Sequence, residues 1–229
     1  MDRLRVRPSS RGSHAARRAW IRRRGDRPAG LPPRQPPCRA TRPAVRLFVA
    51  LNLPDVVRRA LWEAASALRD RDFPIKWVRP EGLHLTLKFL GEVDDARERE
   101  LRDALQRAVA GGKTLPLVLG GFGVFPDFSR PRVVWVGVAP DPALELLQHG
   151  VEREFGPLGF PPEGRAFRPH LTLGRAGRDA RARDFEGLET ALSAMRFEET
   201  VVVETLDLMR STLERGGAVY QVLQRERLS

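Results

Sequence analysis

Cysteine is almost absent from this chain of 229 residues, since Cys38 is the only one. A disulfide within the chain is therefore excluded, and we expect a reducing, cytoplasmic location. Long apolar runs are absent too, because none approaches the ~18 residues that a membrane-spanning helix needs. The sequence thus predicts no membrane partner.

Acidic residues are scarce in residues 1–44, where only Asp2 and Asp26 accompany 13 of the chain's 40 basic residues. This segment accounts for the whole net charge of +11, and residues 45–229 carry equal numbers of acidic and basic side chains. The charge of the body of the chain therefore gives no general attraction for nucleic acid, and any such attraction is confined to local patches.

Residues 1–44 are rich in arginine and proline and show almost no apolar periodicity, so we expect disorder there. A basic RNA-binding arm and an organelle transit peptide are alternatives, whereas a secretory signal is disfavoured because no apolar stretch follows the arginines. The favoured interpretation is a mis-assigned start. The first strand-like segment begins at Val45, and GTG valine codons can initiate translation in bacteria. Residues 45–229 are the expected domain.

An internal repeat runs through that domain. The tetrapeptide HLTL occupies residues 84–87 and again residues 170–173, an offset of 86. The strand-like segments 47–53 and 133–139 run into Pro54-Asp55 and Pro140-Asp141 with the same offset. Two landmarks with one spacing indicate a duplicated supersecondary unit.

Each half has the same coarse order of elements. Helical patterns at 55–70 and 142–155 open at Asp55 and Asp141, which suit helix capping, and further helices are expected at 95–110 and 184–195. Strand-like stretches close the halves at 115–124, 197–209 and 218–224. The short link 79–82 suits a hairpin between strands 75–78 and 83–90. We therefore predict an α+β fold with two pseudo-symmetric lobes of mainly antiparallel sheet, flanked by helices, and an active-site cleft between them.

The repeated strands are polar on one face. Because side chains alternate along a strand, His84 and Thr86 share a face, and Leu83, Leu85, Leu87 and Phe89 share the other, which is expected to be buried. His170 and Thr172 repeat this arrangement. Imidazole, with an unperturbed pKa near ~6.5, can act as acid or base at neutral pH, and threonine hydroxyls can donate to phosphate oxygens. The set predicts acid–base chemistry on a phosphodiester.

Other side chains are candidates for holding the substrate. Lys88 has the strand parity of His84 and Thr86, and Arg168 has that of His170 and Thr172. Arg175 has the opposite parity unless a bulge at Gly174 re-aims it. Phe48 and Trp135 can stack on a base, although core packing is the favoured role for both. His149 is interpreted as a surface or packing residue, and no metal site is expected because neither motif has a second ligand at chelating spacing.

Together these residues resemble the RNA 2′,3′-cyclic phosphodiesterase family, historically called bacterial 2′-5′ RNA ligases, within the 2H phosphoesterase superfamily. The resemblance runs from about Val45 to Leu223. It rests on RLFVALNLP, WVRPEGLHLTLKFLGEV, FPDFSRPRVVWVGV, FRPHLTLGRA and the spacing of Ser211 to Tyr220. It implies metal-independent, cofactor-free hydrolysis of RNA 2′,3′-cyclic phosphate ends to 2′-phosphomonoesters. By the resemblance, His84 is the proton donor to the leaving 3′ oxygen and His170 the proton acceptor.

Three other functions are compatible with the same residues. An ATP-independent 2′-5′ ligation at the same site, a non-catalytic RNA-end or nucleotide-binding module, and an esterase for small cyclic nucleotides all fit the same cleft. ATP-dependent ligation is excluded because none of Lys76, Lys88 and Lys113 stands in a K-x-[DN]-G context. A bilobal domain with its site between the lobes needs no second subunit, so we expect a monomer.

Overall fold

The computed structural model describes residues 44–214 and 217–229, so the predicted extension, Ala44 apart, lies outside the described residues. The strands are β1 Ala44–Asn52, β2 Ile75–Trp77, β3 His84–Asp94, β4 Leu115–Phe125, β5 Val133–Val138, β6 His170–Ala176, β7 Glu198–Val203, β8 Thr205–Glu214 and β9 Gly217–Arg227. The helices are α1 Asp55–Ala64, α2 Ser66–Arg69, α3 Glu98–Ala108, α4 Pro142–Phe155 and α5 Leu188–Ala194.

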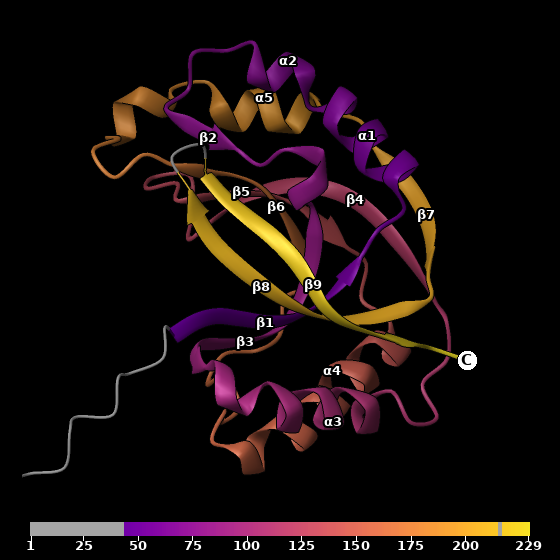
Figure 1. Ribbon diagram of the computed structural model, residues 1–229. Helices are drawn as coiled ribbons and strands as arrows, with labels where there is room; N and C mark the ends of the chain where they lie inside the picture. Colours follow the sequence, from indigo (N-terminus) through magenta and orange to yellow (C-terminus); the bar gives the residue numbers. More distant parts are fainter. Residues whose placement is uncertain (1–43, 215–216) are drawn as a thin grey trace, which may run out of the picture. The chain divides into compact units, whose positions relative to one another are not determined.

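All strands join one curled sheet of order β7-β4-β5-β6-β3-β1-β8-β9, with β2 paired to β6 beside this path. Every described pairing is antiparallel. We call β3, β1, β8 and β9 the first lobe, and β6, β5, β4 and β7 the second lobe. They meet along β3 and β6, so the α+β prediction with two antiparallel lobes is confirmed, and the lobes share one continuous sheet (Figure 1).

The lobes do not coincide with the halves of the sequence. Strand β4 closes the first half of the sequence but pairs with β5 and β7 of the second lobe, whereas β8 belongs to the second half and pairs with β1 of the first lobe. Each half thus contributes a strand to the other lobe. This exchange ties the two lobes together at more than the β3–β6 contact.

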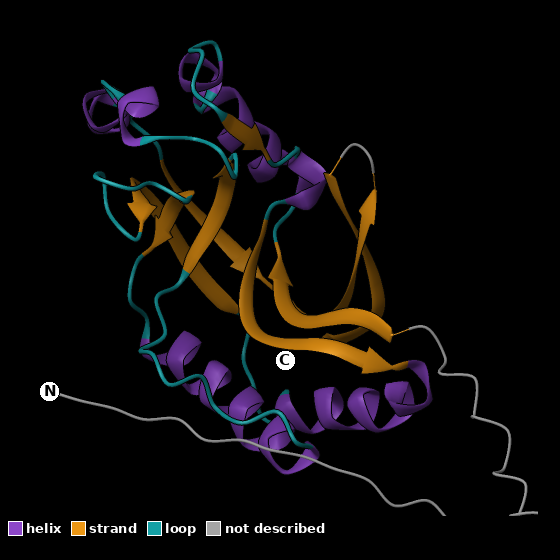
Figure 2. Cartoon of the chain, turned by 90° about the vertical axis from the view of Figure 1, so that its left-hand side faces the viewer, coloured by secondary structure: helices purple, strands orange, loops and turns teal. Residues whose placement is uncertain are grey.

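Two groups of helices lie at opposite ends of the curled sheet, with α1, α2 and α5 at one end and α3 and α4 at the other (Figures 1 and 2). Helices α3 and α4 pack on each other, with α4 on β3 and α3 on β8 and β9, while α5 packs on β4. Buried residues from all these helices join one apolar core with the strand residues Leu85, Leu87, Leu171 and Leu173. We call the opposite face of the strands, which carries the repeated His and Thr side chains, the inner face. No helix in the described ranges is long and apolar enough to cross a membrane.

The same bulge interrupts both central strands. Thr86 pairs with Ala50 and Lys88 with Val49, which leaves Leu87 as an extra residue. Thr172 pairs with Trp135 and Gly174 with Val134, which leaves Leu173 as an extra residue. Because a bulge inserts one residue into one strand, the alternation of faces reverses beyond it. The two bulges keep the offset of 86 seen in the sequence.

Two local predictions are wrong. Strands β2 and β3 form no hairpin, because β2 pairs with β6 and Pro80–Gly82 forms a 3₁₀ turn between them. Asp141 caps α4 as predicted, accepting from the amides of Ala143 at 2.7 Å and Leu144 at 3.1 Å. Asp55 does not cap α1; it lies inside the helix and pairs with Arg58 and Arg59, each at 2.9 Å.

Candidate active site

The two H-x-T motifs lie next to each other on the inner face. Strands β3 and β6 pair antiparallel with Leu85 opposite Leu171. Extending this register by one residue sets His84 level with Thr172 and Thr86 level with His170. The two histidines are then diagonal neighbours, with backbones about 7–8 Å apart in an ordinary antiparallel pair.

Each imidazole is packed among aromatic rings. The His84 ring lies 4.8 Å from the centroid of Phe48 and 4.8 Å from that of Tyr220. The His170 ring lies 4.9 Å from Phe125 and 6.5 Å from Trp135. Phe48 is buried, in agreement with the packing role favoured from the sequence. Neither Phe125 nor Tyr220 was given a role from the sequence: Phe125 appeared only as the first residue of FPDFSRPRVVWVGV, and Tyr220 only as the last residue of the Ser211 to Tyr220 spacing.

Both histidines are tied to the backbone two residues before them. His170 Nδ1 lies 2.7 Å from the carbonyl oxygen of Arg168, and His84 has a hydrogen bond with the backbone of Gly82. A carbonyl only accepts, so the His170 Nδ1 carries the proton and leaves Nε2 free as an acceptor. The bond fixes both the tautomer and the orientation of the ring.

Burial lowers the pKa of both imidazoles. It takes the pKa of His84 to about 4, helped by the charges of Arg175 and Arg58 and opposed by the bond to Gly82. For His170, burial and the Arg175 charge lower the pKa, and the bond to Arg168 opposes them. Burial also raises the pKa of the Tyr220 phenol, against the charge of Arg175. The free protein therefore holds both histidines neutral at pH 7.

The prediction that Lys88 shares the face of His84 is wrong. The bulge at Leu87 turns Lys88 to the core, where its side chain is 1% exposed. Its ammonium pairs with the Glu152 carboxylate on α4 and donates to the Pro161 carbonyl at 3.0 Å. Lys88 thus connects β3 with α4 and with the segment that leads to His170. The same reversal brings Phe89, predicted to be buried, to the inner face with 60% exposure.

The bulge on which Arg175 depended is present at Leu173 and Gly174. Arg175 is exposed and lies on the inner face, and its charge acts on His84, His170 and Tyr220 alike. Among the described residues it is the cation whose charge acts on both histidines. Arg168 is exposed at the entry to β6, and the structure gives its guanidinium no partner among the described residues.

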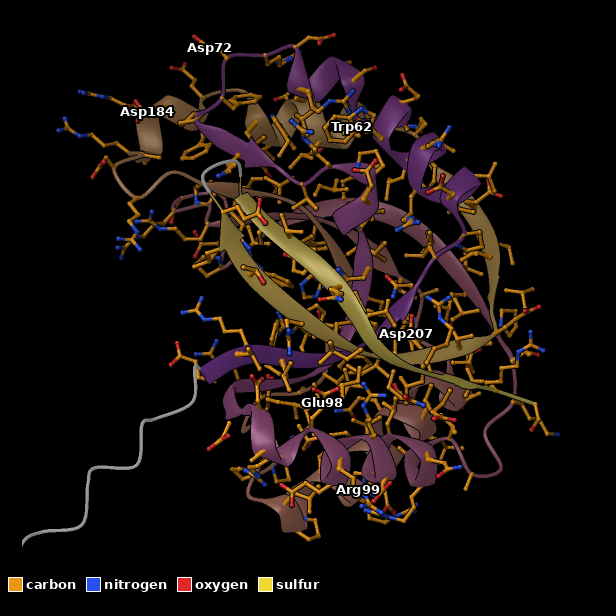
Figure 3. All side chains as sticks on the ribbon, in the orientation of Figure 1. Trp62, Asp72, Glu98, Arg99, Asp184 and Asp207 are labelled. Carbon is orange, nitrogen blue, oxygen red and sulfur yellow. The ribbon has the colours of Figure 1, made fainter. Side chains whose placement is uncertain are left out.

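A polar network beside His84 was not anticipated from the sequence. Asn52 is the ladder partner of His84, and its amide donates to the Asp207 carboxylate at 2.6 Å. Asp207, labelled in Figure 3, is fully buried. It accepts two hydrogen bonds from Arg225, at 2.9 and 3.1 Å. The corresponding partner of His170 is Gly137, which has no side chain. The network therefore distinguishes the two histidines.

Among residues 44–214 and 217–229, no three His, Cys, Asp or Glu side chains are grouped as a metal site would need. The metal-free chemistry stays a prediction.

A curled antiparallel sheet that joins two H-x-T motifs on its inner face defines the class of two-histidine phosphoesterases. A family model described as the 2'-5' RNA ligase superfamily matches residues 57–215. The chain belongs to this superfamily, and the predictions of the family and of an enzyme within it are confirmed.

Individual relatives agree with this family. A Methanothermobacter thermautotrophicus protein named RNA 2',3'-cyclic phosphodiesterase is 33% identical over 189 residues, covering 80% of this chain and 99% of that protein. One from Thermotoga maritima with the same name is 34% identical and covers 78% and 93%. Among solved structures, a Thermus thermophilus protein has a TM-score of 0.67 at 31% identity, covering 80% and 97%. LigT of E. coli complexed with 3'-AMP has 0.66 at 28%, covering 81% and 99%.

Replacing Lys88 with Met should lower the free energy of unfolding by about 3 kcal/mol, because the Glu152 carboxylate would lose its partner inside the protein. The double variant Lys88→Met/Glu152→Gln should recover part of this loss, since it leaves no buried charge. Urea unfolding of both variants measures the effect. Arg46→Gln, which breaks the exposed pair of Arg46 with Glu92, is the control and should change the free energy by less than about 1 kcal/mol. An equal loss in the control and in Lys88→Met would contradict the buried role.

The stability of the protein should fall as the pH drops from about 6.5 to about 4. In this window the unfolded chain protonates His84 while the folded chain does not, so protons favour unfolding. Above the ordinary histidine pKa the effect vanishes. His84→Gln should flatten this part of the curve, by at most about 1.4 kcal/mol per pH unit. Denaturant titrations across the window test the expectation, and an NMR titration giving His84 an ordinary pKa would refute it.

Proposed function

We propose that this protein hydrolyses the 2′,3′-cyclic phosphate at an RNA 3′ end to a 2′-phosphomonoester, without a metal ion. The observation that carries the proposal is the diagonal placement of His84 and His170 on paired antiparallel strands. The two relatives described above, each named RNA 2',3'-cyclic phosphodiesterase, support the substrate class. The solved complex of E. coli LigT with 3'-AMP supports a nucleotide as the bound end group.

In the proposed reaction a water oxygen attacks phosphorus while His170 takes one of its protons on Nε2. The bond from phosphorus to the 3′ oxygen breaks, and His84 gives a proton to that oxygen. The products are a 2′-phosphomonoester and a free 3′ hydroxyl, so one water is added in total. Attack and departure occur on opposite sides of phosphorus, and a diagonal pair of imidazoles suits this geometry. The order of the two roles follows the family resemblance.

Three side chains are proposed to bind the phosphate. Thr86 and Thr172 lie level with the histidines and can donate to the non-bridging oxygens, where negative charge grows in the transition state. Arg175 supplies a positive charge on the same face. Arg168, the remaining arginine that the sequence suggested for phosphate binding, lies two residues before the start of β6.

The lowered pKa values fit this scheme once substrate is bound. An anionic phosphate between the imidazoles favours the imidazolium form and so offsets the desolvation that keeps both rings neutral in the free protein. The more desolvated His84 becomes the stronger acid when it is protonated. This property suits the group that must release a proton to an alkoxide leaving group.

Purified protein with EDTA and no ATP should convert an RNA with a 2′,3′-cyclic end to the 2′-phosphate. His84→Ala and His170→Ala should each lower kcat by about 10²–10⁴-fold, the usual range for a general acid or base. His149→Ala is the matched control, because His149 is exposed on α4. End-group analysis measures the product. Tight binding without turnover would replace the proposal with a binding module, and a joined product would point to 2′-5′ ligation by the reverse reaction.

The pH profile of kcat/KM should be bell-shaped with its optimum below about 6.5. The profile of kcat/KM reports the free enzyme, in which one histidine must be neutral and the other protonated, and both pKa values are lowered. The value of kcat/KM should therefore decline as the pH rises above the higher of the two histidine pKa values. The pH optimum of kcat should be higher than that of kcat/KM, because bound phosphate favours the imidazolium form. A kcat/KM optimum well above neutrality would exclude this assignment of the pair.

A further inference from the structure

Two cations lie directly opposite each other at one end of the inner face. Lys76 on β2 is the ladder partner of Arg175 on β6, and both side chains are exposed. Ladder partners point to the same face of a sheet, so Lys76 shares the face of Arg175 and of the histidines. Like charges directly opposite each other on paired strands destabilise a sheet.

No described carboxylate offsets this pair of charges. Neither side chain forms an ion pair with an acidic residue in the described part of the chain. Glu214 lies near this end of the face, because it is the ladder partner of Gly217, yet it makes no ion pair with Lys76. A bound anion would relieve the repulsion between Lys76 and Arg175.

The side chain of Lys76 points toward Gly217 at the start of β9. A Cβ atom on Gly217 would lie 3.2 Å from Cε and 3.4 Å from Nζ of Lys76. The ammonium therefore reaches from β2, paired to the second lobe, to the start of β9 in the first lobe (Figure 1). Gly217 has a φ of +139°, a conformation that favours glycine, and its missing side chain leaves room for the lysine. Lys76 thus closes one end of the inner face beside Arg175.

We infer that Lys76, beside Arg175, provides a second phosphate subsite, which binds the phosphodiester next to the cyclic end of a single-stranded RNA. This inference rests on the proposed function, in which Arg175 faces the reacting phosphate. A lysine whose backbone is about 5 Å from that of Arg175 places a second charge within reach of the neighbouring phosphate of the same strand. The subsite makes an RNA, rather than a cyclic mononucleotide, the preferred substrate.

The test compares two substrates that differ by one nucleoside and the phosphodiester that joins it: adenosine 2′,3′-cyclic phosphate, and a dinucleotide ending in the same cyclic adenylate. Wild-type protein should have the higher kcat/KM for the dinucleotide. Lys76→Gln should lower that value about fivefold, the size of an exposed ion pair, and leave the mononucleotide unchanged. The salt dependence for the dinucleotide should weaken by about 0.7 in log–log slope. Lys113→Gln, which removes an exposed lysine outside the sheet, is the matched control.

A second measurement needs no turnover. Lys76→Gln should raise the thermal unfolding midpoint of the free protein by about 1–3 °C, because it removes the like-charge pair. Inorganic phosphate should stabilise wild-type protein more than this variant. A lysine that merely pairs with Glu214 would give a lower midpoint and overturn the inference.

The outcomes separate the two proposals. If Lys76→Gln lowers kcat/KM equally for both substrates, or for neither, the subsite is overturned and the proposed hydrolase activity stands. Absence of turnover on both substrates overturns the hydrolase. In that case the subsite is tested by binding: the His170→Ala protein should bind the dinucleotide more tightly than the cyclic mononucleotide, and equal affinities would overturn the subsite.

Discussion

The pairing of β3 with β6 is the constraint on which the site depends. Each H-x-T strand alone presents one imidazole and one hydroxyl, which is too little to act on both sides of a phosphorus atom. The antiparallel register around Leu85 and Leu171 brings the two sets together and sets each histidine level with the other strand's threonine. The buried leucines hold this register, because a slip by one residue would turn the histidines into the core. Packing on the helical side thus determines chemistry on the inner side.

The repeated bulge is the second element of this geometry. It leaves His and Thr in place and exchanges the faces of the residues that follow. In the second lobe the exchange brings Arg175 to the inner face, where its charge acts on both histidines. In the first lobe the same exchange takes Lys88 into the core, where Glu152 and Pro161 hold it. The same bulge therefore exposes a cation beside the histidines in one half of the molecule and buries a cation in the other.

The sequence alone predicted the two motifs, the α+β class and the antiparallel lobes, because these depend on alternation and on a repeat that can be read along the chain. It failed where strands far apart decide the result. The faces of Lys88 and Phe89 depend on a bulge that only the pairing with β1 reveals. The exchange of β4 and β8 between lobes involves long-range pairing that local patterns do not encode. Asn52 and Asp207 are 155 residues apart, and no motif connects them.

Pseudo-symmetry raises a question that the motifs cannot answer, namely which histidine is the acid in the proposed reaction. The answer must come from surroundings that differ between the halves. His84 is the more desolvated ring and has Asn52 as its ladder partner, whereas His170 has Gly137. Because the Asp207 carboxylate only accepts, it must receive the amide NH₂ of Asn52, which turns the amide oxygen away from β8. On that side of β1 lies β3 with His84. The symmetry of the fold is therefore broken next to His84 by Asn52, which is held by the buried Asp207 carboxylate and its partner Arg225. Two equivalent strands thus acquire different surroundings without any change in their motifs.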